Sequence, residues 1–375
     1  MKYLVKPIYK PFLYCIDFMG SFLFRNKKKE VFEKEKIKRI AIIRFDHLGD
    51  VILTTPLFRI LRMKFPHAKI TLLCRTIAKE IMQENKNLDE VISLEPPWFD
   101  RNKEQNKQGF NNFIEEHKKY YDLVLELHAD PRNIFFADKI GKYTIGYGIR
   151  GFGFLLNKTA EYSLEKKHII ERNSDVLSAI GTYEKDKKDM KTEITIPQKV
   201  ENDMRKDLPK GFLICINPGT GRSTKMWDTL KWAKVADELI KKYNVTIVFT
   251  GSQKEKGIIQ EITEDMHAKK YVDMSGKTSP LTLAAVIKQC SLFISPDTGP
   301  LHIARAVETP SIGLFGPVDP AVWGYNEKNH HSIFKNIIEN EYVETNKGMQ
   351  AITVKDVLLE VDRIISFKKA KKSKI

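Results

Sequence analysis

The chain has 375 residues, of which 42% are hydrophobic and 30% charged, and its formal net charge is +15. This length favours two domains or somewhat more, and the apolar content excludes a disordered chain that is too polar to bury a core. Four cysteines are scattered along the sequence without a CxxC pair, which indicates reduced thiols in a cytoplasmic protein and argues against a zinc site. They are Cys15, Cys74, Cys215 and Cys290.

Most of the positive charge lies at the two ends of the chain. Residues 1–39 contain eleven Lys or Arg against four Asp or Glu, and residues 368–375 contain five lysines and no acid. Only +3 is left for residues 40–367, so the sequence does not indicate a basic groove along the body of the protein. Basic ends favour an anionic membrane surface as a partner, and we expect no nucleic acid.

An apolar segment, Pro11–Phe24, precedes the basic run Arg25–Lys29. It spans 14 residues and contains Asp17, whereas a bilayer-spanning helix needs roughly 20 apolar residues. No small-residue cleavage site follows, which argues against a secretory signal. We therefore expect residues 1–36 to anchor the protein on a membrane surface. The alternative is a helix that packs on the protein's own surface.

Strands and helices alternate through the next part of the chain, which predicts a parallel, doubly wound sheet. The region 129–166 has no clear pattern, and Met190–Pro197 should be extended. The predicted strands are Ile37–Arg44, Lys69–Cys74, Glu90–Leu94 and Asp122–Leu127, and the predicted helices are Val51–Phe65, 76–84, 108–120 and Lys167–Ile180.

The same alternation restarts after Gln198–Lys210, which we interpret as the domain boundary because it combines Lys, Asp and Pro. The chain then divides into domains at 37–197 and 198–350, with a C-terminal helix and polybasic tail at 351–375. The second set of strands is predicted at Phe212–Ile216, Val245–Thr250, Ser291–Ser295 and Ser311–Leu314. The helices are predicted at Trp227–Lys242, 254–264, Pro280–Cys290, Pro300–Ala306 and Val354–Phe367, with Tyr271–Met274 between the second and third of them.

The turn between Ser295 and Pro300 predicts an anion site. Pro300 suits the first turn of a helix, which would bring four backbone N–H groups and the positive end of the helix dipole near one point. The four belong to Thr298, Gly299, Leu301 and His302, and the His302 side chain could add a donor. The alternative is an ordinary capped turn. Loops 44–50 and 295–302 both follow strand ends, where parallel sheets bind ligands, so we expect a central cleft between the two domains.

Three motifs in order resemble the heptosyltransferase family of glycosyltransferases, over about residues 38–365. They are Arg44–Pro56 (RFDHLGDVILTTP), Asn217–Gly219 followed by Lys225–Trp227, and Ser295–His302 followed by Gly316–Pro317. The resemblance implies the GT-B fold of two Rossmann-like domains. It also implies inverting transfer of a sugar, typically heptose from ADP-heptose, onto a lipopolysaccharide core acceptor without a metal or other cofactor.

An inverting transfer needs a base that takes the proton of the acceptor hydroxyl. The resemblance assigns this role to Asp50, after Gly49, which permits close approach of backbone and substrate. Asp46 and His47 are local alternatives, and Asp50 could instead be the N-cap of the following helix.

The resemblance also implies a donor site in the second half. Lys225 matches a phosphate-binding lysine and Thr220 a phosphate-contacting threonine, whereas Gly221 replaces the family's second threonine. We expect Asp297 to cap the turn or bind a sugar hydroxyl, because a carboxylate repels a diphosphate. Glu255 matches an acid that contacts donor hydroxyls, or is a charge on a helix face.

The acceptor side is expected to include residues around the first motif and after two later elements. Surface or capping roles are the alternative for the later ones. Trp227 and Trp323 could flank the donor, although core packing is the usual role of tryptophan. The acceptor-side residues are Arg44, Gly49, His128, Arg132, His168 and Arg172, with Asp130 and Asn173 beside them.

These observations predict an inverting glycosyltransferase, peripheral on the inner face of the cytoplasmic membrane, that uses a nucleotide-sugar and a lipid-linked glycan. One alternative is a transferase or an epimerase of similar architecture that uses another nucleotide-sugar. A second alternative is a non-enzymatic binder of nucleotide or nucleic acid through the basic ends.

Overall fold

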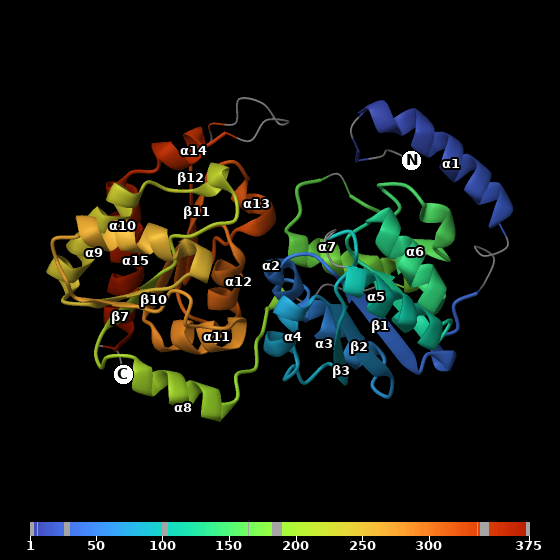
Figure 1. Ribbon diagram of the computed structural model, residues 1–375, viewed down its shortest axis with the longest axis horizontal. Coiled ribbons are helices and arrows are strands. Elements are labelled where there is room, and N and C mark those ends of the chain that lie inside the picture. Colours follow the sequence, from blue (N-terminus) through green and yellow to red (C-terminus); the bar gives the residue numbers. More distant parts are fainter. Residues whose placement is uncertain are drawn as a thin grey trace. The chain divides into compact units, whose positions relative to one another are not determined.

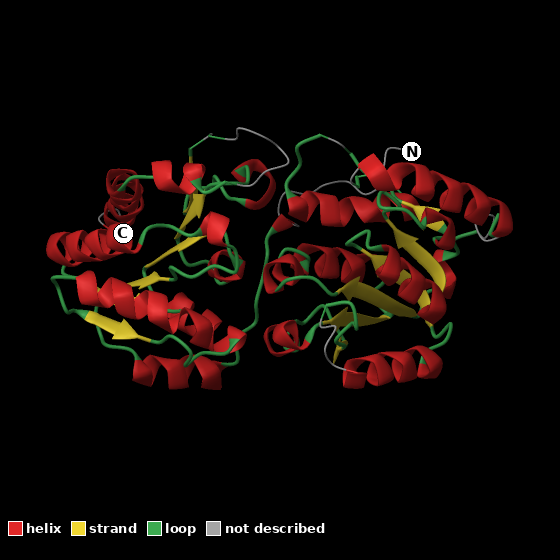
Figure 2. Cartoon of the chain, turned by 45° about the horizontal axis from the view of Figure 1, so that its top comes forward, coloured by secondary structure: helices red, strands yellow, loops and turns green. Residues whose placement is uncertain are grey.

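The computed structural model describes residues 4–5, 7–25, 31–99, 104–163, 165–181, 190–335, 337 and 345–372, without the side chains of 7, 104–106 and 367–372. The chain divides into two compact units, Met1–Thr195 and Ile196–Ile375 (Figure 1). In each unit, helices cover both faces of a six-stranded sheet (Figure 2). Lysines 27–29 and the end of the polybasic tail, 373–375, lie outside the described residues.

The sheet of the first unit is parallel, with the strand order β3-β2-β1-β4-β5-β6. Its central strands are buried on both faces, which explains why their sequences are continuous apolar runs rather than alternating ones. The strands are β1 (Arg39–Arg44), β2 (Lys69–Cys74), β3 (Glu90–Ser93), β4 (Tyr121–Glu126), β5 (Gly141–Gly146) and β6 (Lys158–Thr159).

Seven α-helices are described in this unit, and the one predicted over Val51–Phe65 is in fact two. Pro56 lacks the N–H that a continuous helix would donate to Ile52, and the Thr55 hydroxyl donates to that carbonyl instead, at 2.8 Å. The helices are α1 (Lys10–Leu23), α2 (Leu48–Ile52), α3 (Thr55–Lys64), α4 (Thr76–Met82), α5 (Glu104–Glu116), α6 (Pro131–Ile140) and α7 (Ile169–Asp175).

The region 129–166, which has no clear sequence pattern, contributes α6, β5 and β6. The helix predicted over Lys167–Ile180 ends early, since α7 is followed by a 3-10 helix at Val176–Ile180. Met190–Pro197 belongs to neither sheet.

The second unit has the strand order β12-β11-β10-β7-β8-β9, also parallel. Its strands are β7 (Leu213–Ile216), β8 (Thr246–Phe249), β9 (Tyr271–Asp273), β10 (Leu292–Pro296), β11 (Ser311–Phe315) and β12 (His330–Phe334). Its helices are α8 (Gln198–Asp207), α9 (Thr229–Tyr243), α10 (Lys256–Asp265), α11 (Pro280–Gln289), α12 (Gly299–Ala306), α13 (Pro320–Trp323), α14 (Lys347–Ala351) and α15 (Val354–Lys372).

The segment Gln198–Lys210, interpreted as the domain boundary, begins just after the division between Thr195 and Ile196. It forms the helix α8, which is held to α11 by an ion pair between Glu201 and Lys288. The elements β12, α13 and α14 were not predicted from the sequence. The C-terminal helix α15 is part of the core of this unit, because Val357 and Val361 are fully buried there.

In each sheet the order in which successive strands are added reverses at one position, the switch point. In the first, β1 pairs with β2 on one side and with β4 on the other; in the second, β7 pairs with β8 and with β10. The strand carboxyl ends at such a switch point diverge into a crevice where α/β proteins bind ligands. The predicted fold class, two doubly wound Rossmann-like domains, is confirmed for each unit, and the switch points predict where each unit binds its ligand.

Candidate active site

Arg44, the last residue of β1, contacts two carboxylates at the first switch point. Its guanidinium lies 3.2 Å from Oδ1 of Asp46 and 3.5 Å from Oδ1 of Asp50, and its side chain is buried. The contact with Asp46 lacks hydrogen-bond geometry, and among the described residues Arg44 Nε and Asp46 Oδ1 have no hydrogen-bond partner. Burial raises the pKa of Asp46, against the opposing charge of Arg44.

Asp50 is the more accessible of the two carboxylates and belongs to α2. Its Oδ2 accepts the backbone N–H of His47 at 3.3 Å. His47 is the N-cap residue, so Asp50 stands at the third helical position and its alternative role as N-cap is corrected. The His47 side chain is exposed, and Gly49 is buried in the same turn.

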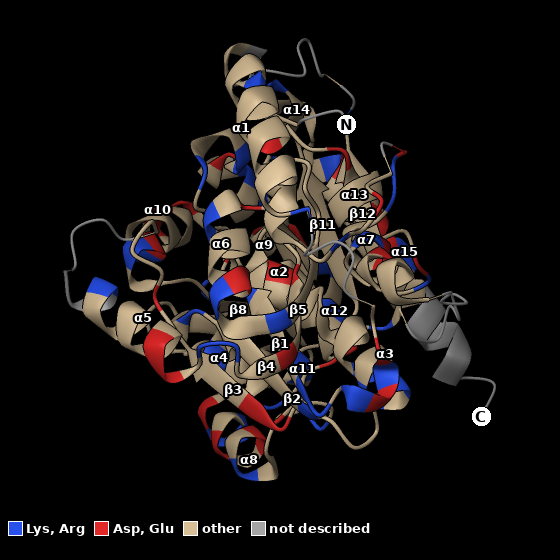
Figure 3. Ribbon diagram, turned by 90° about the vertical axis from the view of Figure 1, so that its right-hand side faces the viewer, with Lys and Arg blue, Asp and Glu red and all other residues tan. Residues whose placement is uncertain are grey.

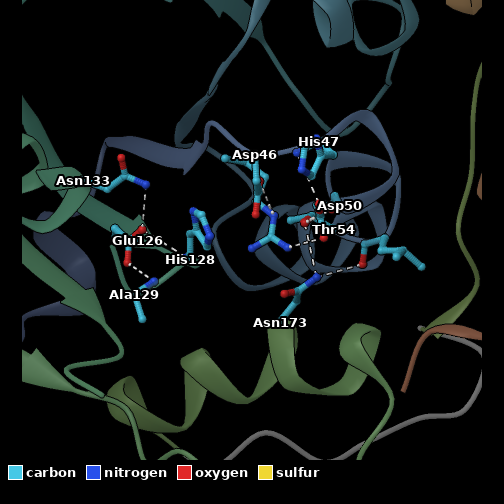
Figure 4. A network of polar contacts seen from close by, with 11 residues as sticks. Asp46, His47, Asp50, Thr54, Glu126, His128, Ala129, Asn133 and Asn173 are labelled. Atoms are coloured by element: carbon cyan, nitrogen blue, oxygen red, sulfur yellow. Dashed lines mark hydrogen bonds and ion pairs between the residues drawn. The ribbon is translucent and has the colours of Figure 1, made fainter. Parts of the chain in front are cut away.

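A second element fixes this turn from behind. The Thr54 hydroxyl donates to the Asp50 carbonyl at 2.8 Å. Asn173 of α7 donates from Nδ2 to the Leu53 carbonyl at 3.1 Å and to the Thr54 hydroxyl at 3.3 Å (Figure 4). Because Asn173 is buried, these bonds tie α7 to the corner between α2 and α3 and hold the backbone of Asp50 in place.

Glu126 is the last residue of the neighbouring strand, β4, and His128 follows it (Figure 4). The Glu126 carboxyl accepts the N–H groups of His128 and Ala129 and the amide of Asn133, at 3.0, 2.7 and 3.2 Å. Burial raises the pKa of Glu126 to about 7 despite these donors. Burial, with the charges of Arg44 and Arg150, lowers the pKa of His128 to about 4, so His128 is neutral at pH 7.

Asp130 and Arg132 bind each other. Asp130 caps α6 by accepting the Arg132 N–H at 2.9 Å, and the Arg132 guanidinium donates to both carboxylate oxygens. Arg132 also lies over the Trp98 ring, 5.4 Å from its centroid. The capping role considered for Asp130 is therefore observed, and half of the Arg132 side chain remains exposed at the sheet edge.

His168 and Arg172 are positioned by α7. His168 Nδ1 accepts the Ile170 N–H at 3.3 Å, so this side chain caps the helix. The Arg172 guanidinium lies 4.6 Å from the centroid of the Tyr162 ring and donates to the Glu165 carbonyl. Asn173 on the same helix is the residue of this group that contacts the Asp50 turn.

In the second unit, the segment after β7 runs beside the end of β10. The Asn217 N–H donates to the Ile294 carbonyl at 3.0 Å, and its side chain donates to the Gly219 carbonyl. Gly219 lies directly against Glu255: a Cβ there would come within 2.2 Å of the Glu255 carboxyl carbon. Glu255 also accepts the Ser252 N–H at 2.6 Å, so its carboxylate is fixed by its own turn where that turn lies against Gly219.

Thr220 and Gly221 form the tip of this segment. The Thr220 hydroxyl accepts the Arg222 N–H at 3.3 Å. Gly221 is exposed, and no described atom lies within 4 Å of a Cβ built on it. There is therefore open space at Gly221, where the family's second threonine would place its hydroxyl. The turn itself does not require glycine.

Lys225 pairs with Asp297 at the second switch point. Its ammonium lies 2.5 Å from Oδ2 of Asp297 and 3.3 Å from the carbonyl of the same residue. Asp297 is buried and Lys225 nearly so. The carboxylate does not cap α12, whose N-cap residue is Thr298; it contacts the lysine instead.

The start of α12 differs in detail from the predicted anion site. Leu301 donates its N–H to the Thr298 carbonyl at 3.0 Å, so this N–H is not available to a ligand. The N–H groups of Thr298 and Gly299 precede it, beside Lys225. The His302 side chain is buried and its Nδ1 lies 2.7 Å from the Tyr325 hydroxyl, so its ring position is fixed by the fold.

The two tryptophans differ. Trp227 is buried in the core and donates from Nε1 to the Ile352 carbonyl, whereas Trp323 is half-buried at the end of α13. Within the described part of the chain, no three His, Cys, Asp or Glu side chains are arranged to hold a metal ion.

Sequence reasoning missed Glu126 and Tyr325. The sequence contained a sign that Glu126 is special, because it is a carboxylate at the end of an apolar strand and lies two residues before the predicted His128. Tyr325 had none, because only the folding of the loop after β11 brings it to His302.

The sequence is similar to proteins of a known family. The sequence model of glycosyltransferase family 9 (heptosyltransferase) matches residues 114–352. Lipopolysaccharide heptosyltransferase 3 of Escherichia coli K12 is 27% identical over 339 residues, which cover 84% of this chain and 95% of that protein.

Solved structures agree with the fold. A family 9 glycosyl transferase from Veillonella parvula superposes with a TM-score of 0.74 and 26% identity, over 87% of this chain and 97% of that one. E. coli ADP-heptose lps heptosyltransferase II, a GT-B protein, gives 0.72 and 19% identity, over 88% and 99%. The family match covers well over half of the sequence, so the chain belongs to glycosyltransferase family 9, the heptosyltransferase family, and is a glycosyltransferase.

Proposed function

We propose that this protein transfers heptose from ADP-heptose to a lipopolysaccharide or lipooligosaccharide core acceptor, with inversion and with Asp50 as the base. The observation that carries the proposal is the pair of switch points, each of which presents the residues that one half of such a reaction needs. Family membership supports the reaction class, and the names of the similar proteins support the donor and the acceptor.

The donor half of the reaction needs positive charge for a diphosphate. Lys225 and the N–H groups of Thr298 and Gly299 at the start of α12 are the groups available at the second switch point. Together with the helix dipole, they would stabilise the charge that develops on the departing nucleoside diphosphate. Glu255, which lies against Gly219, would accept hydrogen bonds from hydroxyl groups of the donor.

The acceptor half needs a base that a substrate can reach. Asp50 meets this condition better than Asp46, which is buried, and its backbone is held by Thr54 and Asn173. Asp50 would take the proton of the acceptor hydroxyl while the hydroxyl oxygen bonds to the anomeric carbon. The bond from that carbon to the diphosphate breaks, and the diphosphate leaves with the electron pair.

The acceptor is lipid-linked, so we also propose that the protein works as a peripheral protein on the inner face of the cytoplasmic membrane. Its basic ends would bind anionic lipid and raise the local concentration of acceptor. No helix in the described residues is long and apolar enough to cross a bilayer.

The first test is donor binding by calorimetry on the full chain, comparing ADP-heptose with UDP- and GDP-sugars in the presence of a chelator. We expect selective binding of ADP-heptose, and transfer of heptose when the core acceptor is added. Selective binding of another nucleotide-sugar would keep the transferase and discard heptose. A complete loss of binding in the chelator, restored by a divalent cation, would discard the metal-free mechanism.

A further inference from the structure

Helix α1 has two unlike faces. Leu13, Ile16, Asp17 and Gly20 recur at spacings of three and four residues, so they share one side of the helix. Leu13 and Gly20 are buried, and Ile16 and Asp17 are half-buried. This inner face packs on the part of the first unit that follows β5, so the segment does pack on the protein's own surface. The outer face determines whether it can also contact a membrane.

The inner face is fitted to its site. A Cβ on Gly20 would come within 2.4 Å of the Phe154 ring, so only glycine lets the helix lie this close. Asp17 accepts the N–H of Phe152 at 2.8 Å. Ahead of the helix, Leu4 donates its N–H to the Ile149 carbonyl at 2.8 Å. These contacts fix the orientation of α1 on the first unit.

The outer face is apolar and exposed. Its large side chains are between 59% and 79% exposed and share one face of the helix. Exposed apolar residues that occur singly are normal on a soluble protein, whereas a contiguous apolar patch indicates an interaction surface. Figure 1 shows α1 at the edge of its unit, and in Figure 3 the helix is mostly free of charged residues. The outer face consists of Phe12, Phe18, Met19, Phe22 and Leu23, with the exposed Cys15 among them.

The charged residues around this face are basic at the two ends of the helix and acidic only on the inner face. Asp17 is the only acid in the helix, and its carboxylate is turned to the Phe152 N–H on the inner face. Lys10 begins the helix, and Arg25 follows it with its guanidinium 5.7 Å from the centroid of the Phe22 ring. Lysines 27, 28 and 29 come next in sequence. An aromatic face bordered by cations and free of acid is complementary to an anionic bilayer.

We propose that the outer face of α1 is a bilayer-docking surface, which lies in the headgroup region of an anionic membrane while the inner face stays packed on the first unit. This deepens the peripheral location proposed above. Because α1 is fixed on the acceptor-side unit, docking would orient that unit toward the lipid that carries the acceptor. Binding through the basic tail alone would recruit the protein without orienting α1 on the bilayer.

The chain provides its own probe site. Cys15 is the exposed cysteine on the outer face, whereas Cys74, Cys215 and Cys290 are buried. An environment-sensitive fluorophore on Cys15 of the full chain should shift to the blue when vesicles of zwitterionic and anionic phospholipid are added. The shift should be smaller with purely zwitterionic vesicles and at high salt. The same shift in both lipids at every salt concentration would discard the charge complementarity.

A double variant, Phe18→Asp with Phe22→Asp, tests the surface on unlabelled protein by sedimentation with the same vesicles. We expect binding to weaken by about tenfold or more, because two charges enter the apolar region. Both side chains are exposed, so the fold should be kept, which thermal unfolding would verify. Ile77→Asp is the matched control: Ile77 is 52% exposed on α4, toward the β3 edge of the sheet and away from α1 at the other edge.

Three results would overturn the proposal. The double variant could sediment with vesicles as the wild type does. The Cys15 probe could stay unshifted while the protein binds vesicles, which would assign binding to the basic tail alone. Light scattering could show a dimer that the double variant dissociates, which would make the outer face a contact between two copies. No donor is needed in these measurements, so a failed transfer assay would count against the proposed function and not against this surface.

Discussion

The Lys225 ammonium and the Asp297 carboxylate form a 2.5 Å ion pair at the second switch point, where the donor site was expected. Each residue comes from a different motif of the sequence, one after β7 and one after β10. The lysine therefore has an anionic partner before any ligand binds. Asp297 holds the ammonium beside the start of α12, and a diphosphate would have to share the lysine with this carboxylate.

Lys225→Ala should weaken binding of a nucleoside diphosphate by about 10- to 100-fold, since a charge-assisted hydrogen bond is lost and the Asp297 charge is left uncompensated. Adding Asp297→Asn to that variant should restore part of the affinity, because the repulsion disappears. Calorimetry on the four members of this double-mutant cycle measures the coupling. Lys234→Ala is the control and should leave binding unchanged, because Lys234 is exposed on α9. If the losses in binding free energy of the two single variants simply added up in the double variant, the pairing would be contradicted.

Asp50→Asn should lower kcat by about 10²- to 10⁴-fold with little change in donor affinity, because the amide cannot accept the proton of the acceptor hydroxyl. Asp46→Asn is the matched comparison, since Asp46 contacts the same arginine but is buried. Steady-state kinetics of both variants, with thermal unfolding as a check on the fold, separate the two carboxylates. A larger loss in Asp46→Asn than in Asp50→Asn would move the base to Asp46.

The two glycines of the donor loop should respond in opposite ways. Gly221→Thr adds a hydroxyl into open space and should leave ADP affinity unchanged or raise it up to about tenfold. Gly219→Ala puts a Cβ within 2.2 Å of the Glu255 carboxyl carbon, so Glu255 has to move and affinity should fall. Calorimetry with ADP measures both; equal losses would show that the loop tolerates no side chain at all.

Glu126 should make the first unit less stable as pH rises. Its pKa is raised by burial from 4.5 to about 7, so the folded state binds the proton more tightly than the unfolded state does. The stabilisation is complete below the unfolded pKa and is lost as pH rises through the folded pKa, by roughly 3 kcal/mol in total.

In urea unfolding between pH 4 and pH 8, the free energy of unfolding of the wild type should therefore fall more, or rise less, with pH than that of Glu126→Gln. Only the slopes are compared, because the glutamine also changes the hydrogen bonds to His128 and Ala129. Glu116→Gln, exposed on α5, should keep the wild-type slope. An unchanged slope in Glu126→Gln would show that this carboxyl has the same pKa in the folded and unfolded states.

The strand pattern could be predicted from sequence because buried parallel strands are continuous apolar runs, and each predicted strand overlaps an observed one. Helix ends were harder to predict. The break between α2 and α3 depends on Thr55 donating to Ile52, and α8 is a polar helix whose packing on α11 has no periodic apolar signal of its own.

The sequence by itself determined the fold class, the motifs and the order in which they occur, because these depend on local periodicity and on residue types at fixed spacing. Tertiary structure decided which side chains meet. Asn173 behind the Asp50 turn, Lys225 on Asp297 and the inner face of α1 on Phe154 all join residues that are distant in sequence. Such contacts are set by strand order and helix packing, and residue spacing along the chain carries no record of them.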